Sequence, residues 1–439
     1  MLIRYGTFCV KWGLSPYSII VRELLKNRPI LAWAFYDWAN SAFATTVMAG
    51  FFPVFFQKFW SIDVTPTETT SRLGFGNAIA GAVIALLAPI LGAIADRGGR
   101  RKQFMFSWTL LGVVATGGLY LAAHGDWMMA LAMFVVATLG FNGGIVFNDS
   151  LLLDVAKPAE LDRVSALGYS LGYLGGGLLF LVNVIMVSKP QLFGLASDAQ
   201  AVRWSFVTVA AWWLVFTIPI MRVVKEQQRG PHLKFGAAVS VGFRELGNTI
   251  THLRQYRTLV LFLVAYWFYI DGVNTIIKMA VDYGTALGLN TSKLLTALLV
   301  TQFVGFPAAL LFGWLGDRIG ARRGILIGLV VYVGITVYAY FLDSEGEFFT
   351  LAIAVGLVQG GVQSLSRSLF GRLVPEGKNA EFFGFYNMMG KFATVLGPLL
   401  IAVVAALTHN QRASIVSLVL LFVVGGVLLW RVKLPPKIA

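Results

Sequence analysis

The chain has 439 residues, of which 57% are hydrophobic and 13% charged, and its mean hydropathy is +0.74. A soluble domain carries about twice this charged fraction, so the composition excludes an ordinary water-soluble protein. The net charge of +14 raises the alternative of a nucleic-acid-binding protein. The single cysteine, Cys9, excludes an intrachain disulfide.

Apolar runs of about twenty residues recur along the chain, and this is the length that spans a bilayer core of roughly 30 Å. We therefore predict an all-α integral membrane protein with twelve transmembrane helices. The first six spans are predicted at 29–57, 73–95, 103–123, 128–153, 163–187 and 204–221. The second six are predicted at 258–283, 293–316, 324–342, 348–371, 382–407 and 413–430.

The basic residues follow the positive-inside rule if the N-terminus is cytoplasmic. Most lysines and arginines then fall in cytoplasmic segments. The exceptions in the outer loops are Lys58, Arg72, Lys189, Arg203, Lys293 and Arg412. The net charge is therefore a topology signal: it predicts that both termini are cytoplasmic, and it argues against nucleic acid as a partner.

The longest predicted loop, 225–257, separates two six-helix halves, 29–224 and 258–431, with short cytoplasmic segments at 1–28 and 432–439. Apolar residues in this loop recur at three- and four-residue steps, which predicts a helix with one apolar face. They are Phe235, Val239, Phe243, Leu246, Ile250 and Leu253. We expect the helix to lie on the cytoplasmic membrane surface; a calmodulin-type target is the alternative.

The two halves repeat three landmarks in the same order. The sequence GAIADRGGRRK begins at Gly92 after span two, and GWLGDRIGARR begins at Gly313 after span eight. A D-x-x-N pair begins at Asp37 in span one and at Asp271 in span seven, and a Gly-Gly pair occurs in spans four and ten. The repeats indicate an internal duplication, which is common in transporter folds. We therefore predict two pseudo-symmetric six-helix bundles.

Polar residues inside membrane spans are costly, so their distribution is informative. Spans three, six, nine and twelve lack charged residues, Asn and Gln away from their ends, which predicts a lipid-facing outer scaffold. Spans one, four, seven, ten and eleven carry polar residues at helical spacing, and these faces predict a water-accessible central cavity for substrate or protons. The candidate cavity residues are Asp37, Asn40, Asn142, Asp149, Asp271, Asn274, Lys278, Gln359, Gln363, Arg367, Asn387 and Lys391.

The charged residues within the spans need partners or water, because an unpaired charge there costs several kcal/mol. Asp271 and Lys278 are seven residues apart, about 10 Å along a helix axis, which is too far for a direct bond. We expect Lys278 to pair with Asp282, so Asp271 needs a partner from another helix or a proton. Proton loading at Asp37 or Asp271 is therefore a hypothesis. The alternative for any one of these charges is a static ion pair between helices.

The paired loops after spans two and eight resemble the signature of the major facilitator superfamily, and the resemblance covers the chain from Ala32 onward. It implies two six-helix bundles that rock about a central site. It also implies a conformational latch of Gly92, Asp96, Arg97 and Arg101 with Gly313, Asp317 and Arg318. The second copy has Ala321 where the first has Arg100, so we expect its latch to be weaker. The alternative is that these charges only anchor the loops.

Longer stretches are similar to one branch, the autophagy-related vacuolar effluxer family and its bacterial relatives. They are Trp33–Asn40, Phe268–Thr275, Gly360–Leu369, Glu381–Asn387 and Gly390–Thr394. Fungal members are associated with efflux of amino acids from the vacuole, so the resemblance implies amino acids as the default substrate. Together with the compact loops, it implies a bacterial inner (plasma) membrane.

We therefore expect a secondary active transporter, not an enzyme, that moves a small organic solute by alternating access. Amino-acid export is the default, and proton coupling is a hypothesis. The alternatives are transport of peptides or cell-wall fragments, and a non-transporting receptor or lipid-handling scaffold on the same fold. The expected partners are a small-molecule substrate, protons and the lipid bilayer. We expect a monomer with no cofactor and no metal site.

One enzyme-like motif has a simpler explanation. The segment from Gly168 to Gly172 matches the G-x-S-x-G pattern of hydrolases, but that motif requires a strand–turn–helix context and this copy lies in an apolar span. Glycines 168, 172 and 176 instead predict a small-residue stripe for close helix packing. The chain also lacks the G-x-x-x-x-G-K-[ST] and H-E-x-x-H motifs of nucleotide and zinc sites.

Overall fold

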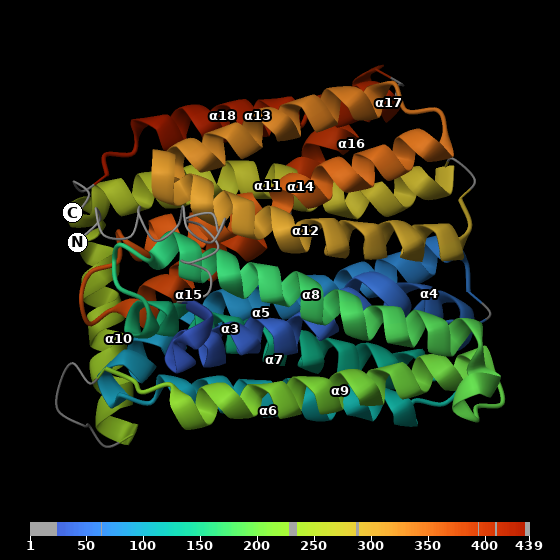
Figure 1. Cartoon of the computed structure of the whole chain (residues 1–439), viewed down its shortest axis with the longest axis horizontal. Helices are drawn as coiled ribbons and strands as arrows, with labels where there is room; N and C mark the ends of the chain where they lie inside the picture. The colour runs from blue at the N-terminus through green and yellow to red at the C-terminus, as the bar shows by residue number, and fades with distance from the viewer. Residues whose placement is uncertain are drawn as a thin grey trace, which may run out of the picture.

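The computed structural model describes residues 24–62, 64–227, 235–286, 289–393, 395–408 and 411–434. These residues are almost entirely helical, and none of them forms a β-strand. Twelve of their helical segments are long and apolar enough to cross a membrane, which confirms the predicted number of spans. The helices lie side by side along one axis (Figure 1). Helices suit a bilayer because every interior backbone group is hydrogen-bonded within its own segment.

The first half of the chain supplies six spans. Span one is a continuous helical segment from Arg28 to Trp60 whose later part contains π-helical turns. It consists of α3 (Arg28–Ala42), η1 (Phe43–Phe51), α4 (Phe52–Phe55) and η2 (Phe56–Trp60). The other spans are α5 (Pro66–Gly98), α6 (Arg101–Gly118), α7 (Trp127–Val155), α8 (Leu161–Ser188) and α9 (Asp198–Val223).

The second half also supplies six spans, and its last two spans each consist of two helices. Its spans are α11 (Arg257–Ala286), α12 (Thr291–Ile319), α13 (Ala321–Tyr340), α14 (Glu345–Gly371), α15 (Asn379–Phe392) with α16 (Leu396–Thr408), and α17 (Gln411–Val416) with α18 (Val419–Arg431). The predicted span eleven, 382–407, is present as the candidate span Asn379–Thr408, but it is not one continuous helix. The helix stops at Phe392 and a new one starts at Leu396.

A helix in the predicted linker crosses one end of the molecule. Figure 1 shows α10 (Phe235–Thr251) roughly perpendicular to the spans, at the end where α3 begins and α18 ends. We call this end the α10 face and the other end the opposite face. On its inner side α10 packs against α5, where Gly242 lies against Ile94. Phe243 and Ile250 are exposed on the helix.

The two halves meet along two seams. Helix α8 of the first half packs along α12 and α14, and α15 of the second half packs along α5 and α7. The α5–α15 seam is very close: a Cβ at Gly92 would lie 2.2 Å from the carbonyl oxygen of Ala380, and one at Gly384 would lie 2.6 Å from that of Ala88. Only glycine permits backbones to approach this closely. The predicted latch glycine thus lies in the seam itself.

The spans without internal polar residues lie outside. Helices α6, α9, α13 and α18 carry apolar side chains that are exposed in the isolated chain, such as Val114, Val215, Val330 and Leu420. In a bilayer these surfaces face lipid. The buried polar side chains are concentrated instead on α3, α7, α8, α11 and α14, which line the interior of the two halves.

Candidate functional site

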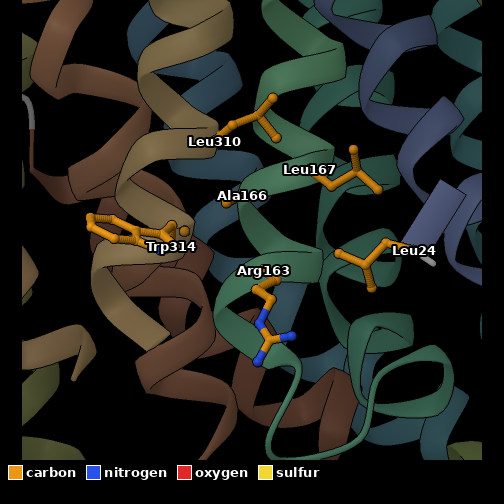
Figure 2. Close-up of a pocket in the computed structure, with 7 residues that line it drawn as sticks. Leu24, Arg163, Ala166, Leu167, Leu310 and Trp314 are labelled. Atoms are coloured by element: carbon orange, nitrogen blue, oxygen red, sulfur yellow. The ribbon is translucent and has the colours of Figure 1, made fainter. Parts of the chain in front are cut away.

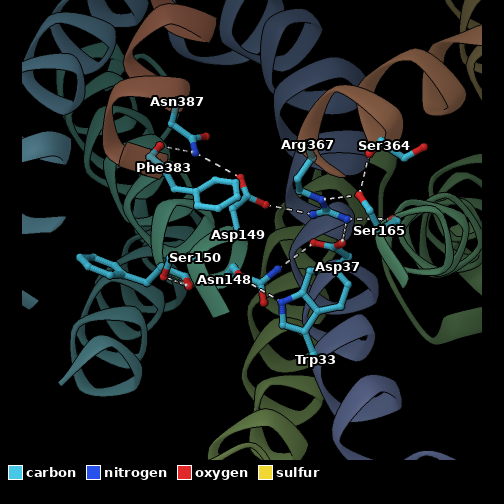
Figure 3. Close-up of polar contacts among 11 residues, drawn as sticks. Trp33, Asp37, Asn148, Asp149, Ser150, Ser165, Ser364, Arg367, Phe383 and Asn387 are labelled. Atoms are coloured by element: carbon cyan, nitrogen blue, oxygen red, sulfur yellow. Dashed lines mark hydrogen bonds and ion pairs between the residues drawn. The ribbon is translucent and has the colours of Figure 1, made fainter. Parts of the chain in front are cut away.

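Arg367 on α14 reaches from the second half into the first. One guanidinium nitrogen lies 3.0 Å from a carboxylate oxygen of Asp37 on α3, and the other lies 3.0 Å from a carboxylate oxygen of Asp149 on α7. Figure 3 shows the two carboxylates on either side of the guanidinium. These two ion pairs join residues that are 330 and 218 positions apart in the chain. We call Asp37, Asp149 and Arg367 the central charge cluster.

Serines on the crossing helices hold Arg367 in place. Its Nε donates to Ser165 Oγ at 2.9 Å, and a terminal nitrogen donates to the Ser165 carbonyl oxygen at 2.9 Å. Ser165 Oγ in turn donates to the carbonyl oxygen of Ser364 at 2.8 Å. The guanidinium is therefore bound by α3, α7 and α8 of the first half while its own helix belongs to the second.

Two asparagines bind the remaining carboxylate oxygens. Asn148 Nδ2 donates to Asp37 at 3.1 Å, and Asn387 Nδ2 on α15 donates to Asp149 at 3.1 Å. Trp33 Nε1 donates to the carbonyl oxygen of Asn148 at 2.7 Å, which fixes the turn of α7 that carries Asp149. Asp37 is thus held by Asn148 of its own half and by Arg367, whereas Asp149 is held by Arg367 and Asn387 of the second half (Figure 3).

The cluster is buried and formally unbalanced. Arg367 is 2% exposed, Asp149 3% and Asp37 9%. The guanidinium also lies over the rings of Trp33 and Tyr169, at 4.8 and 4.4 Å from their centres, where aromatic faces attract a cation. Two carboxylates face one guanidinium, so the three groups carry one excess negative charge. Burying such a charge is costly unless a proton or another cation neutralises it.

Small residues explain how the cluster fits. A Cβ at Gly168 of α8 would lie 2.3 Å from an Asp37 carboxylate oxygen and 2.9 Å from an Arg367 nitrogen. The same stripe continues at Gly172, where a Cβ would lie 2.7 Å from Ser41 Oγ. The glycines of the G-x-S-x-G segment therefore make room for α3 and its charge pair. Ser170 donates to the Phe306 carbonyl oxygen at 2.9 Å, within the α8–α12 seam.

Two further predicted residues continue the polar surface toward the opposite face. Asn40 follows Asp37 on α3, and Asn142 lies two turns from Asp149 on α7, each on the side away from the α10 face. Both are buried, at 3% and 4% exposure. Asn40 Nδ2 and Asn142 Oδ1 have no hydrogen-bond partner among the described residues. Buried polar atoms are rarely left unpaired, so such atoms call for an explanation.

The remaining predicted cavity residues lie in different surroundings. Gln359 and Gln363 are half-buried, two turns and one turn before Arg367 on α14, respectively. Lys391 is half-buried in the last turn of α15. Asp271 and Asn274 bind the backbone of span eleven and not the central charge cluster. The side chains of Lys278 and Asp282, and the ion pair predicted between them, lie outside the described residues.

The first predicted latch segment contacts the other half directly. Asp96 accepts a hydrogen bond from the backbone N–H of Glu381 in α15 at 2.9 Å, so the last turn of α5 in the first half binds the start of a helix in the second. A carboxylate at a helix N-terminus is favoured by the helix dipole. Arg101 stays within the first half, 2.7 Å from Asp154, and Arg97 pairs with Glu245 of α10 at 3.1 Å.

The second predicted latch segment also reaches across, through a different partner. Asp317 at the end of α12 forms an ion pair with Arg163 of α8, while Arg318 lies over the ring of Trp314 at 4.6 Å. Next to Arg163, Asp162 accepts from Arg372 at 2.6 Å and from Ser368 at 2.5 Å. These contacts close the α8–α12 and α8–α14 seams near the α10 face.

A pocket between α8 and α12 lies beside these contacts. It is lined by Leu24, Arg163, Ala166, Leu167, Leu310, Gly313 and Trp314 (Figure 2). Most of the lining is apolar, and the guanidinium of Arg163 points away from the apolar side chains. None of the predicted cavity residues lines it, so we assign no solute site there.

Several residues that support the cluster or join the halves are not predicted from the sequence. Ser165 and Asn148 support the central charge cluster, and Asp162 and Arg163 close the seam. One signal was present: an Asp-Arg pair occurs at 162–163, as it does at both predicted latch segments. The sequence does not predict the role of the Ser165 hydroxyl, because that role depends on which helix crosses α14.

The comparison with a family model decides the classification. Residues 26–437 match the family described as vacuole effluxer Atg22 like. The chain belongs to this Atg22-like family. An uncharacterized MFS-type transporter of Bacillus subtilis, YxiO, is 41% identical over 403 residues, which cover 91% of this chain and 93% of that protein. Autophagy-related protein 22 of Eremothecium gossypii is 23% identical, with coverage of 91% and 90%.

Solved structures show the fold of this Atg22-like protein independently. The proton:xylose symporter XylE superposes with a TM-score of 0.66 over 93% of this chain and 95% of its own, at 13% identity. The human organic anion transporter MFSD10 gives 0.65 over 95% and 100%, at 17% identity. The major facilitator fold predicted from the paired loops is thus confirmed, and the protein is a membrane transporter by fold and by its relatives.

Proposed function

We propose that this Atg22-like protein is a secondary active transporter that moves a small organic solute by alternating access, with the central charge cluster as its coupling element. One observation carries the proposal: Arg367 of the second half bonds simultaneously to Asp37, Asp149 and Ser165 of the first, deep in the interior. If the halves rock apart at the α10 face, these bonds must break. The free energy of the cluster is therefore part of the free energy difference between the two states.

The contacts at the α10 face support the assignment of a state. Asp96 with α15, Asp317 with Arg163, and Asp162 with Arg372 all join the halves there. The structure thus represents the state closed at the α10 face. In our proposal this face is cytoplasmic, because the basic loops lie on it, and the latch residues Gly92, Asp96, Arg97, Arg101, Gly313, Asp317 and Arg318 stabilise its closed state.

The chemistry of the cluster suits an amino acid. A zwitterion presents an ammonium group to a carboxylate and a carboxylate to a guanidinium, and Asp37, Asp149 and Arg367 offer both. Unpaired Asn40 Nδ2 and Asn142 Oδ1 would supply one donor and one acceptor on the side toward the opposite face. The family description names effluxers, which favours export as the direction. Gln359, Gln363, Asn387 and Lys391 complete the proposed cavity, while Asp271, Asn274 and Lys278 are kept as candidates only at its edge.

Proton coupling follows from the charge count. The cluster has one excess negative charge in a buried place, and the charge is neutralised if a proton or the substrate's ammonium group binds. A protonated aspartate also no longer attracts Arg367, so binding and the opening of the α10 face would be linked. We propose that the membrane is a bacterial inner membrane, that the halves are 29–224 and 258–431, and that the monomer is the working unit.

The test is thermal stability of the purified protein in detergent against amino acids, short peptides, sugars and cell-wall fragments. A ligand at a hundredfold excess over its Kd stabilises the folded state by about 2.7 kcal/mol. We expect a shift with an amino acid that is smaller in Asp37→Asn. A shift with only a peptide or wall fragment would keep the transport mechanism and overturn the amino-acid assignment.

A measurement of solute flux distinguishes a transporter from a non-transporting membrane protein. Proteoliposomes containing the protein should take up or release the ligand found above, and Asp149→Asn should reduce that flux while the protein still folds. A receptor or lipid-handling scaffold would bind the ligand without moving it. Binding without flux in well-sealed vesicles would therefore contradict the proposal.

A further inference from the structure

Span eleven is interrupted about midway along its length. Helix α15 ends at Phe392, Ala393 leaves helical geometry with ψ 51°, and α16 begins at Leu396. A break of this kind exposes carbonyl groups at the end of one helix and N–H groups at the start of the next. In hydrocarbon each such group needs a partner from the protein, because no water is present to bind it.

The D-x-x-N pair of span seven supplies these partners. Asp271 on α11 accepts hydrogen bonds from the N–H groups of Leu396 and Gly397, at 2.8 and 2.9 Å, which are the first residues of α16. Asn274, one turn further along α11, donates from Nδ2 to the carbonyl oxygen of Ala393 at 2.9 Å. One face of α11 thus caps both ends of the break.

The fit on this face is specific. Thr275 Oγ1 donates to the same Asp271 oxygen that binds Gly397, at 3.2 Å. A Cβ at Gly397 would lie 2.0 Å from Thr275 Oγ1 and 2.7 Å from that Asp271 oxygen. Asp271 itself is fully shielded from solvent. The carboxylate therefore lies against the positive end of α16, where a negative charge is stabilised.

The first half uses the equivalent residues differently. Asp37 and Ser41, four residues apart on span one, lie against Gly168 and Gly172 of span five, as Asp271 and Thr275 lie against Gly397. Helix α8 is continuous there, however, so its backbone offers no free N–H groups to Asp37. Asp37 instead binds Arg367 of the other half. The duplicated aspartates have therefore acquired separate tasks.

We infer that Asp271 is a positioning residue that joins span eleven to span seven, and that it does not carry the transported proton. The break then divides span eleven into two bodies. Helix α15 is fixed to α5 of the first half through Gly92, Gly384 and Asp96. Helix α16 packs on α11 of its own half. Helices α15 and α16 therefore move relative to one another when the α10 face opens, and Asp271 keeps α16 with α11 during that movement.

The direct test is hydrogen–deuterium exchange of the purified full-length protein in detergent, followed in peptides that cover 393–400. In Asp271→Ala we expect the N–H groups at 396 and 397 to exchange about tenfold faster, because a lost helix cap has roughly that effect on local stability. Asp271→Asn should give an intermediate rate, since the amide oxygen still accepts one bond. The matched control Asp198→Ala, which removes a carboxylate from the first turn of α9 in the other half, should leave this segment unchanged.

Unchanged exchange at 396 and 397 in Asp271→Ala, or equal acceleration in the Asp198→Ala control, would overturn the inference. If Asp271→Ala does not fold, Asn274→Ala tests the other end of the break: it should raise exchange near 393–397 without removing a charge, and no change there would count against the inference.

A transport measurement gives a second test. It rests on the proposed function, whereas the exchange measurement does not. The pH profile of flux should move in Asp37→Asn and stay in place in Asp271→Asn, while the maximal rate of Asp271→Asn falls. A moved profile in Asp271→Asn would make Asp271 a proton carrier and overturn the inference even if exchange accelerates. Absence of flux in the wild type would overturn the transport proposal, while the exchange result would still decide the role of Asp271.

Discussion

Arg367 bonds to three helices of the other half, and its position explains why removing it should be harmful. Its guanidinium offers flat, forked donors that reach Asp37, Asp149 and Ser165 together. A lysine has one ammonium group at the same place and cannot make all of these bonds in one geometry. The residue thus sets both the charge balance and the geometry of the interior.

We predict that Arg367→Ala lowers the free energy of unfolding by about 3 kcal/mol or more, because it leaves two buried carboxylates without a cation. The measurement is thermal unfolding in detergent. The variant Arg367→Gln with Asp37→Asn and Asp149→Asn, in which all three groups are neutral, should recover most of the loss. Equal destabilisation by the neutral variant would show that packing, not charge, is responsible.

We predict that Asp37→Asn moves the pH dependence of transport. The substitution leaves one carboxylate and one guanidinium, so the cluster is already neutral and has no reason to take up a proton. Flux into proteoliposomes at several external pH values measures this, with Asp162→Asn at the α8–α14 seam as the control for a changed ion pair elsewhere. A pH profile identical to that of the wild type would contradict the proton-coupling proposal.

The sequence predicts the members of the cluster better than their bonds. Helical spacing places Asp37, Asp149, Arg367 and Asn387 on interior faces, and the structure brings these four together. Which partner each one takes depends on how the helices cross, and spacing along one helix does not contain that information. The two D-x-x-N pairs show this clearly: they are alike in sequence and bind different groups.

Among the elements, the break in span eleven was not predictable from the sequence. Its sequence is apolar from Leu396 to Thr408 and contains no charge or proline at 393–395. The break is stabilised by Asp271 and Asn274, which lie more than a hundred residues earlier. Length and hydropathy were sufficient to predict where the other spans lie, because these properties depend on the sequence of the segment itself. Helix ends also extend past the predicted spans, as α5 does from Pro66 to Gly98.

We predict that Gly92→Ala weakens closure of the α10 face. The added methyl group would lie 2.2 Å from the Ala380 carbonyl oxygen, and a backbone atom is not easily displaced. A cysteine placed at the buried position Asn379, in a Cys9→Ser background, should then react faster with a maleimide. Gly74→Ala on the same helix meets nothing within 4 Å and serves as the control. Equal maleimide reactivity of the cysteine in the parent protein, in Gly92→Ala and in Gly74→Ala would contradict this role of Gly92.

At the scale of the whole molecule, the ion pairs between the two halves lie in the interior and toward one end. The central charge cluster, the α5–α15 seam and the ion pairs of Asp162 and Asp317 lie from the middle of the membrane to the α10 face. Helix α10 adds a bridge there, since Glu245 lies 3.1 Å from Arg97 of the first half and 3.6 Å from Lys378 of the second. Partly exposed pairs of this kind contribute about 1 kcal/mol or less. The buried cluster therefore dominates the electrostatic part of closure.

The central claim is that the charge cluster holds the α10 face closed and separates when that face opens. The most direct measurement is the distance between spin labels at Lys157 and Arg323, exposed positions of the two halves at this face, in a Cys9→Ser background. We predict one short distance for the wild type, and a second, longer distance in the neutral variant with Arg367→Gln, Asp37→Asn and Asp149→Asn. A distance distribution identical in the two proteins would contradict the claim.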